Sequence, residues 1–214
     1  MARVIAVVGN KGGSGKSTAA HLIAHGCGSL ARQVPTVVVT TDPAETPRTD
    51  RRRYAVMDGR TRDGLLACMR RLLEVEYLLV VLDGAAARPE VDAVVADVAD
   101  LALLPFKPSA QDAERAVTNL AQLPASAVAL PMDWPALPAS AKRVKRYLEM
   151  LPAERRLPPF KHIPKLADLL GDAYTDAAYD LANPARGLAL EVLARAGIDP
   201  DDLVPPKHHG TAVS

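Results

Sequence analysis

One stretch near the N-terminus restricts the possible folds of this chain more than any other, the run Gly9-Asn10-Lys11-Gly12-Gly13-Ser14-Gly15-Lys16-Ser17-Thr18. It follows the apolar residues 4–8 and precedes a helical pattern that starts near Lys16. A strand, a glycine-rich turn and a helix in this order hold a polyphosphate, because glycines let successive backbone N–H groups point inward and the helix adds the positive end of its dipole. In such a loop Lys16 contacts the β- and γ-phosphates, and Ser17 binds Mg²⁺ with Thr18 behind it. The stretch therefore predicts a nucleotide-binding P-loop.

The second lysine of this loop is unusual. The standard motif Gly-x-x-x-x-Gly-Lys-Ser requires glycine at position 10, where this chain has Asn10, and Lys11 stands ahead of the paired glycines. The pattern Lys-Gly-Gly-x-Gly-Lys-Ser resembles the deviant Walker A loop of the ParA/MinD family of ATPases, most closely the short ParA/ParF-type partition ATPases. The resemblance implies a homodimer formed on ATP, in which Lys11 crosses to the phosphates of the partner. It also implies that ATP and Mg²⁺ are bound, with nucleotide contacts from Lys11, Gly12, Gly13, Ser14, Gly15, Lys16, Ser17 and Thr18.

Strand patterns alternate with amphipathic helical patterns along the chain. The strand patterns cover residues 4–8, 36–40, 54–57, 78–82, 101–104, 127–130 and 158–163, and the helical patterns cover 16–30, 63–74, 90–98, 139–151 and 183–197. This alternation is typical of βαβ units. It predicts an α/β fold of three layers, with a mostly parallel central sheet and helices on both faces.

Three helices carry more detailed predictions. Ser109 is expected to cap a helix, with Asp112 completing a variant of the capping box. Asn183 and Pro184 are expected to open the last helix, which Gly197 ends. The helix over residues 63–74 is expected to bury the stripe Leu65, Leu66, Met69, Leu72 and Leu73.

The bulk properties fit one globular domain. The chain has 214 residues and a net charge of +1, so no overall field attracts nucleic acid and any DNA binding requires a local patch. Cys27 and Cys68 are too few for a disulfide framework or a zinc site, and both lie in helical patterns, where we expect buried free thiols. No signal peptide and no membrane-length apolar run is evident. We expect a cytoplasmic protein with one P-loop ATPase domain over residues 1–198 and a disordered tail over residues 199–214.

Two aspartates follow strand patterns, at the sheet edge where open α/β folds bind ligands. Asp83 follows residues 78–82 and matches a Walker B aspartate, which holds Mg²⁺ through water, and Gly84 offers a backbone N–H to the γ-phosphate. By the resemblance, Asp42 positions the attacking water, so that the expected catalytic residues are Lys11, Lys16 and Asp42. The family has Asp-x-Asp-Pro here and this chain has Thr40 in place of the first aspartate, which is expected to alter the Mg²⁺ shell or slow turnover. Turn capping stays open as another role for both aspartates.

The loops expected around the base favour ATP over GTP only slightly. Pro105 and Pro108 belong to a Pro-x-x-Pro-Ser segment that resembles the loop bordering adenine in the family. The loop after Leu130 reads the base in related proteins, and here it contains Asp133. The related signal-recognition GTPases have Thr-Lys-x-Asp at this place, with the aspartate reading guanine, and this chain lacks that lysine in its loop.

A basic cluster lies in the C-terminal part of the chain: Lys142, Arg143, Lys145, Arg146, Arg155, Arg156 and Lys161. A run of charge is often only a solvated face, and that interpretation stays open. In ParA-type proteins such residues bind DNA non-specifically once ATP has formed the dimer, and doubling the patch makes DNA affinity follow the nucleotide state. The resemblance therefore implies association with the nucleoid. MinD-type members end in a basic membrane helix, whereas residues 198–202 are acidic, so no membrane partner is expected.

Together, the motifs and the resemblance predict a weak Mg²⁺-dependent ATPase that hydrolyses ATP to ADP and phosphate. It is expected to dimerise on ATP, to bind DNA, and to segregate or position a cargo such as a plasmid with a ParB-like or other partner protein that stimulates hydrolysis. Two alternatives stay open. One is an ATP-dependent metabolic or metal-handling P-loop enzyme, and the other is a nucleotide-switched binding module with little hydrolysis.

Overall fold

The computed structural model describes residues 1–9, 11–42, 52–84, 95–96, 99–171 and 174–206. Within these residues a single sheet of six strands forms in the order β3-β2-β4-β1-β5-β6, and all of its pairings are parallel. The strands are β1 (Arg3–Val7), β2 (Thr36–Thr40), β3 (Ala55–Asp58), β4 (Leu79–Asp83), β5 (Leu101–Phe106) and β6 (Val128–Pro131). The prediction of a parallel α/β sheet is confirmed.

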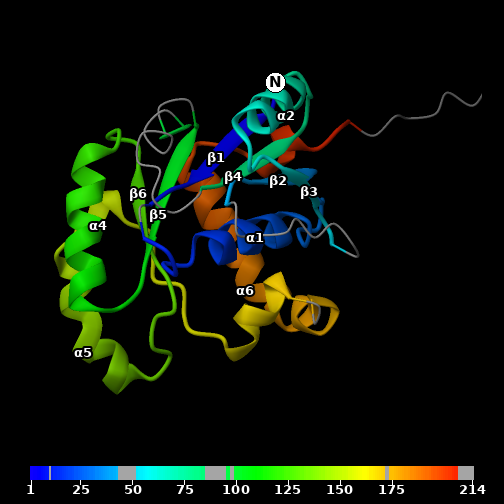
Figure 1. The fold of residues 1–214 in the computed structure, drawn as a ribbon. Helices are drawn as coiled ribbons and strands as arrows, with labels where there is room; N and C mark the ends of the chain where they lie inside the picture. The colour runs from blue at the N-terminus through cyan, green and yellow to red at the C-terminus, as the bar shows by residue number, and fades with distance from the viewer. Residues whose placement is uncertain (10, 43–51, 85–94, 97–98, 172–173, 207–214) are drawn as a thin grey trace, which may run out of the picture.

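Helices cover both faces of the sheet, which makes the three layers (Figure 1). One face packs against α1 (Lys16–Cys27) and α6 (Tyr174–Arg195) through side chains such as Ile5, Leu79 and Leu103. The opposite face packs against α4 (Ala110–Gln122), α5 (Pro138–Glu149) and α2 (Arg62–Leu73). Alternate residues of each strand point to opposite faces, so a strand buried on both sides reads as a continuous apolar run. Three short 3₁₀ segments, η1 (Ala153–Arg155), η2 (Pro164–Leu170) and η3 (Pro200–Leu203), complete the described elements.

The last helix differs from its predicted start. It begins at Tyr174 rather than at Asn183, and Pro184 lies inside it. A proline in a helix interior removes one backbone hydrogen bond and is normally unfavourable. Here the residues around Pro184 pack against α1, with Leu181 and Ala185 fully buried, so tertiary packing outweighs the local signal. The predicted end is confirmed, because Gly197 has φ +66 and the N–H of Ile198 donates to the carbonyl of Leu193 at 2.9 Å.

The predicted strand over residues 158–163 is wrong, although this segment runs beside β6. Phe160 N–H donates to the Pro131 carbonyl at 2.8 Å, and Trp134 N–H donates to the Phe160 carbonyl at 2.9 Å. Only isolated bridges result, at Arg156 and Lys161. The prolines at 158 and 159 have no N–H group, so a continuous ladder cannot form.

One smaller expectation also changes. Leu66 is 45% exposed, whereas the rest of the predicted stripe on α2 faces the core or its margin. Within the predicted tail, Asp199 caps η3 and Leu203 is buried. The domain boundary at residue 198 stays a prediction. Residues 207–214 of that tail, most of the helix expected over 90–98, and Asn10 of the loop lie outside the described residues.

Candidate nucleotide-binding site

The turn between β1 and α1 has the backbone that a phosphate loop needs. Gly13 and Gly15 have φ of +75 and +97, which side-chain-bearing residues rarely adopt. Gly15 is the N-cap of α1, and neither a side-chain cap nor an acidic residue of the first turn neutralises the positive end of the helix. A Cβ atom on Gly12 or Gly13 would meet nothing within 4 Å, so this side of the turn is open. The predicted loop geometry is therefore present, and it fits an anionic group.

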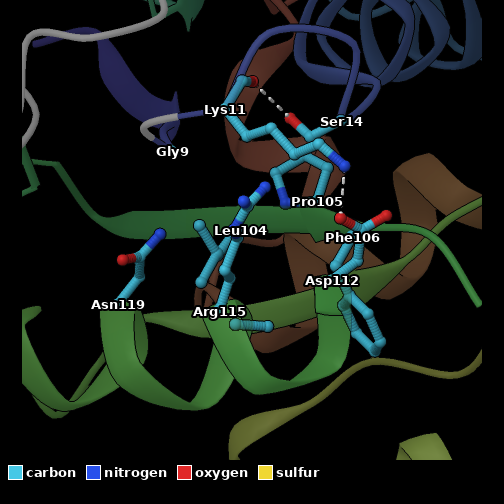
Figure 2. Close-up of a pocket in the computed structure, with 10 residues that line it drawn as sticks. Gly9, Lys11, Ser14, Leu104, Pro105, Phe106, Asp112, Arg115 and Asn119 are labelled. Carbon is cyan, nitrogen blue, oxygen red and sulfur yellow. Dashed lines mark hydrogen bonds and ion pairs between the residues drawn. The ribbon is translucent and has the colours of Figure 1, made fainter. Parts of the chain in front are cut away.

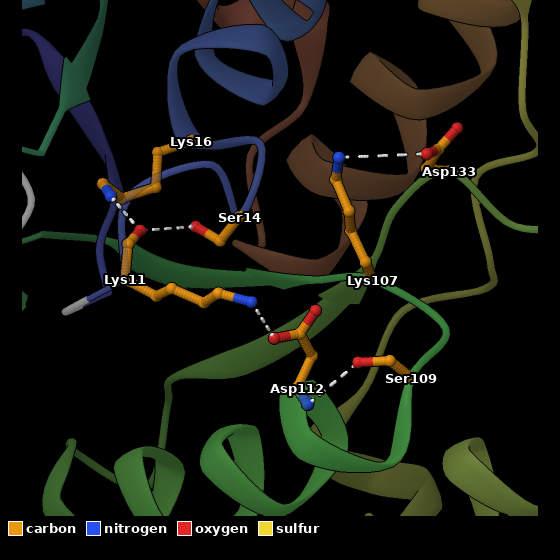
Figure 3. A network of polar contacts seen from close by, with 7 residues as sticks. All are labelled: Lys11, Ser14, Lys16, Lys107, Ser109, Asp112 and Asp133. Atoms are coloured by element: carbon orange, nitrogen blue, oxygen red, sulfur yellow. Dashed lines mark hydrogen bonds and ion pairs between the residues drawn. The ribbon is translucent and has the colours of Figure 1, made fainter.

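The two lysines of the loop contact different groups (Figure 3). Lys16 is 6% exposed, and its Nζ donates to the backbone carbonyl of Lys11 at 2.9 Å. Ser14 Oγ donates to the same carbonyl at 3.2 Å, which curls the loop around Lys11. The side chain of Lys11 runs instead to α4, where its Nζ lies 2.5 Å from Asp112 Oδ1.

Asp112 has a different role from the one the capping pattern predicts. Ser109 does cap α4, since its Oγ accepts from the Asp112 N–H at 3.2 Å. The Asp112 carboxylate does not complete a capping box, because the Ser109 N–H donates to the Lys107 carbonyl and Asp112 pairs with Lys11. The Asp112 side chain is only 8% exposed, so this ion pair is largely shielded on the carboxylate side.

A small cavity lies on the α4 side of the loop (Figure 2). Its lining includes Lys11 and three residues of α4, namely Asp112, Arg115 one turn later and Asn119 two turns later. The cavity has a volume of about 20 Å³, which holds no more than a water molecule. This cavity is too small to enclose the base of a nucleotide.

The three strand ends meet as predicted. Asp83 pairs in register with Val7 of β1 and with Thr40 of β2, so all three residues lie at the carboxyl ends of neighbouring strands. Asp83 is fully buried there, and its backbone carbonyl accepts from the N–H and the hydroxyl of Thr41 at 3.0 and 2.8 Å. Asp42 follows directly and is half-buried. Asp83 supplies a buried carboxylate at the end of β4 and Ser17 a hydroxyl in the first turn of α1, which is the oxygen-donor chemistry that Mg²⁺ requires, so the residues present fit this ion.

The predicted role of Gly84 needs a rearrangement. Its N–H donates to the Val7 carbonyl at 2.9 Å in this structure. Binding a γ-phosphate through that N–H requires this bond to open. The role stays a prediction.

A larger cavity lies on the other side of the loop and has a volume of about 360 Å³. This volume falls within the range of small-molecule sites, about 300–1,000 Å³. Its lining joins the loop to the segments that follow β5, β6 and residue 160: Gly13, Gly15, Thr18, Lys107, Met132, Asp133, His162, Ile163, Pro164 and Leu166. Of the residues expected near the base, Asp133 lines the cavity, whereas Pro105 lies inside β5 and lines the small cavity. Pro108 lies in the turn before α4 and lines neither cavity.

Two residues of the larger cavity were not predicted from the sequence. His162 Nδ1 lies 2.5 Å from Asp133 Oδ1, and Lys107 Nζ lies 3.9 Å from Asp133 Oδ2. Lys107 follows the neighbouring strand β5, and it supplies a lysine beside Asp133 although the loop after β6 has none (Figure 3). Asp133 itself has φ +60, a conformation that aspartate tolerates better than most residues.

The basic cluster divides into three parts. Lys142, Arg143, Lys145 and Arg146 all lie on α5, where none of them is buried. Arg155 donates to the carbonyls of Ala127 and Pro124, and Arg156 donates to those of Leu148 and Leu151. These two guanidinium groups therefore hold the chain around β6 rather than extend the basic surface. Lys161 is exposed and lies apart from α5, in the segment beside β6.

A buried polar contact connects α1 to the segment that enters β3. His21 Nδ1 lies 2.8 Å from Tyr54 Oη, and Arg52 donates to the same oxygen at 2.9 Å. Burial, together with the charge of Arg52, lowers the pKa of His21 to about 3. The histidine is therefore a neutral structural group. Cys27 is also buried, and burial raises the pKa of its thiol to about 12, as expected for an unreactive core cysteine.

No protein-family model matches the chain, and no curated protein matches its sequence. Solved structures do match its fold. Apo McdA of Cyanothece, which has also been crystallised as an ATP complex, matches with a TM-score of 0.64 at 15% identity over 90% of this chain and 100% of McdA. A chain of the MinC:MinD cell division protein complex of Aquifex aeolicus gives a TM-score of 0.66 at 13% identity over 90% and 96% of the two chains. Cobyrinic acid a,c-diamide synthase of Mycobacterium smegmatis, with bound ADP and magnesium, gives a TM-score of 0.56 at 17% identity over 92% of this chain and 97% of the synthase chain.

These matches show that the chain has the fold of the ParA/MinD-type P-loop ATPases. The predicted resemblance is confirmed at this level. Among the helices that the structure describes, none combines the length and the hydropathy required to span a membrane.

Proposed function

We propose that this chain is a ParA/MinD-type positioning ATPase. It binds ATP with Mg²⁺, forms a homodimer around the nucleotides and binds DNA without sequence preference. A ParB-like or other partner protein stimulates hydrolysis, so that a plasmid or another cargo is segregated or positioned. The observation that carries the proposal is the P-loop with two lysines, Lys11 and Lys16, on a sheet of this fold. The ATP and ADP–magnesium complexes of its structural neighbours support ATP and Mg²⁺ as the ligands.

The different positions of Lys11 and Lys16 support the proposed dimer. Lys16 is buried at the loop, where it neutralises the phosphates bound by its own chain. Lys11 is 39% exposed and extends to the α4 side, away from the larger cavity that would hold its own nucleotide. A second ammonium on this side is suited to the nucleotide of another chain. It reaches that nucleotide only after leaving Asp112.

Hydrolysis in this proposal is a matter of positioning and charge. Ser17, in the first turn of α1, and Asp83, at the end of β4, are the residues that would hold Mg²⁺. When bound, the ion would supply positive charge that offsets the charge of the phosphates. Lys16 binds the transferred phosphate, and Asp42 orients the attacking water. Thr40, which is 1% exposed, replaces a carboxylate beside this site and is expected to keep turnover slow.

The DNA-binding surface in this proposal is α5. Lys142, Arg143, Lys145 and Arg146 belong to one helix, and dimerisation presents two such helices to one duplex. Lys145 lies 3.4 Å from Glu149 and Arg146 lies over the Tyr147 ring, which orders both side chains only weakly because they are exposed. Lys161 stays a candidate, whereas Arg155 and Arg156 are assigned to structure.

The test is DNA binding, measured by gel shift and sedimentation with ADP, ATP and a non-hydrolysable ATP analogue. We expect binding to unrelated sequences with ATP or the analogue only, and loss of this binding in Lys11→Ala. The double variant Lys142→Ala/Arg143→Ala should weaken DNA binding. The slope of the logarithm of the association constant against the logarithm of the salt concentration should become shallower by about 0.9 for each phosphate that the variant no longer neutralises. The matched control Arg70→Ala/Arg71→Ala removes two charges from α2 and should leave binding unchanged. Absence of DNA binding in every nucleotide state would exclude the nucleoid surface.

A second candidate is an ATP-dependent metabolic enzyme, which the likeness to cobyrinic acid a,c-diamide synthase supports. It predicts ATP consumption that needs a small-molecule substrate and is unaffected by DNA. The third possibility, a nucleotide-switched binding module, predicts ATP-dependent DNA binding with hydrolysis that DNA and partner do not stimulate. The same binding experiment, with phosphate release measured in parallel, separates the three.

A further inference from the structure

We infer that the His162–Asp133 pair is a base-reading element that selects a 6-amino purine over a 6-keto purine. The inference rests on the proposed nucleotide binding at the P-loop and concerns the chain's own choice of base. Neither residue belongs to the phosphate loop, and His162 carries no motif in the sequence.

The cavities determine where a base can lie. Phosphates held by the loop sit beside Gly13, Gly15 and the first turn of α1. The cavity of about 20 Å³ beside Lys11 is too small for a ring, whereas the cavity of about 360 Å³ starts at Gly13, Gly15 and Thr18. Of these two cavities beside the loop, only the larger one has room for a base, and Asp133 and His162 line it.

The ion pair fixes the chemistry of the imidazole. Asp133 Oδ1 lies 2.5 Å from His162 Nδ1. A carboxylate only accepts hydrogen bonds, so Nδ1 must carry the proton, and in the neutral ring Nε2 is then an acceptor. The 6-amino group of adenine donates hydrogen bonds, whereas the 6-oxygen of guanine or hypoxanthine accepts them. An acceptor at Nε2 binds the amino group and opposes the keto oxygen.

Reading of guanine by Asp133 itself is the competing interpretation. Oδ1 is engaged by His162, and Oδ2 lies 3.9 Å from the ammonium of Lys107. A carboxylate reads guanine by accepting from its N1–H and its 2-amino group. A guanine donor would have to share Oδ1 with His162, so the contact that orients the imidazole competes with guanine reading.

The test measures base preference by competition. ADP, IDP, GDP and the 6-unsubstituted purine riboside diphosphate displace a fluorescent ADP labelled on the ribose, at pH 8.5. IDP differs from ADP only where the 6-amino group is replaced by a keto group and N1 gains a proton. We expect wild type to bind ADP about tenfold or more tighter than IDP and about tenfold tighter than the unsubstituted analogue, as one net hydrogen bond requires.

The variants assign this preference to the pair. His162→Ala should bind ADP about tenfold more weakly and discriminate ADP from IDP by less than about threefold. Asp133→Asn replaces a group that only accepts by an amide that can accept from Nδ1–H or donate to Nδ1, so Nε2 is no longer fixed as an acceptor and the preference should fall. The control Lys165→Ala changes an exposed residue near His162 that does not line the cavity, and it should keep the wild-type preference. Thermal unfolding without nucleotide verifies that each variant folds.

Four results would overturn the inference. Equal binding of ADP and IDP by wild type, or full discrimination in His162→Ala, would show that the pair does not read the base. Tighter binding of GDP than ADP, lost in Asp133→Asn, would show that Asp133 reads guanine. Absence of binding by any nucleotide would refute the proposed function itself, and the inference with it.

Discussion

The close packing of α1 against α6 at Gly26 leads to a prediction about stability. Replacing glycine by alanine should lower the free energy of unfolding at Gly26 of α1 and raise it at Gly187 of α6. A Cβ atom added to Gly26 of α1 would lie 2.1 Å from the Ala185 carbonyl oxygen, 2.6 Å from its carbon and 2.8 Å from Ala189 Cβ. Two of these atoms belong to the backbone of α6, so no side-chain rotation can relieve the clash. A Cβ atom added to Gly187 of α6 would meet nothing within 4 Å.

The magnitude follows from two opposing terms. Glycine to alanine inside a helix normally stabilises by about 1 kcal/mol. At Gly26 the two helices must also separate by roughly 1 Å to restore van der Waals distances, and overpacking of a core costs about 1–3 kcal/mol or more. Because the clash is with backbone, we take the upper end and expect Gly26→Ala to lower the free energy of unfolding by about 2 kcal/mol. Gly187→Ala should raise it by about 0.5–1 kcal/mol.

The assay is unfolding by heat and by urea, monitored by circular dichroism without nucleotide. For a chain of this length, 1 kcal/mol corresponds to about 2–4 °C in Tm. We therefore expect Gly26→Ala to melt about 4–8 °C below wild type and Gly187→Ala to melt about 1–4 °C above it. A Gly26→Ala protein as stable as wild type would refute the close approach of α1 and α6. An equal loss of stability in both variants would show that the effect is not specific to this pair of helices.

Four further predictions concern single side chains. Lys16→Ala should weaken ADP binding about tenfold to a hundredfold in an equilibrium titration, because it removes a charge-assisted hydrogen bond to phosphate. The pKa of His21 is lowered to about 3 from an ordinary value of 6.5, so between these pH values only the unfolded chain binds the extra proton. The free energy of unfolding should therefore fall as the pH falls from 6.5 towards 3. The urea midpoint of His21→Gln should fall less over this range than that of wild type. Cys27, whose thiol pKa burial raises to about 12, should resist alkylation at pH 8 until urea unfolds the chain, and rapid native labelling would contradict its burial. Arg155→Ala should lower the free energy of unfolding by about 1–3 kcal/mol, because the carbonyls of Ala127 and Pro124 lose their donor. It should leave the proposed ATP-dependent DNA binding at wild-type strength. Weaker DNA binding with unchanged stability would instead indicate that Arg155 contacts DNA.

The parts of the site that follow one local pattern could be predicted from the sequence. The P-loop is contiguous, so its glycines, Lys16 and the start of α1 are all specified within one short run of chain. The convergence of Thr40 and Asp83 on the same edge is also predictable, because parallel strands joined by helices end at the same edge of a sheet. Neither prediction requires the order of the strands.

The larger cavity could not be predicted in the same way, because its wall depends on long-range packing. Lys107 reaches Asp133 only because β5 and β6 are neighbours. His162 reaches it only because the segment after Phe160 hydrogen-bonds to Trp134. Residues 158–163 contain two prolines and one histidine, and their apolar residues predict a strand that the structure does not contain. Backbone pairing to β6 without a ladder has no periodic signature in the sequence, so no local pattern could reveal it.

Lys11 shows the same division within a single residue. Its position in the loop predicts a role at phosphate, but only the fold brings it to Asp112, which lies 101 residues later in the chain. The Asp112 carboxylate is 8% exposed and Lys11 is 39% exposed, so breaking the pair leaves a mostly buried carboxylate without its ammonium. A second chain that takes Lys11 must offset this cost, which a nucleoside triphosphate does better than a diphosphate because it presents more negative charge. The ion pair therefore gives a physical reason why the proposed dimer would form on ATP and not on ADP.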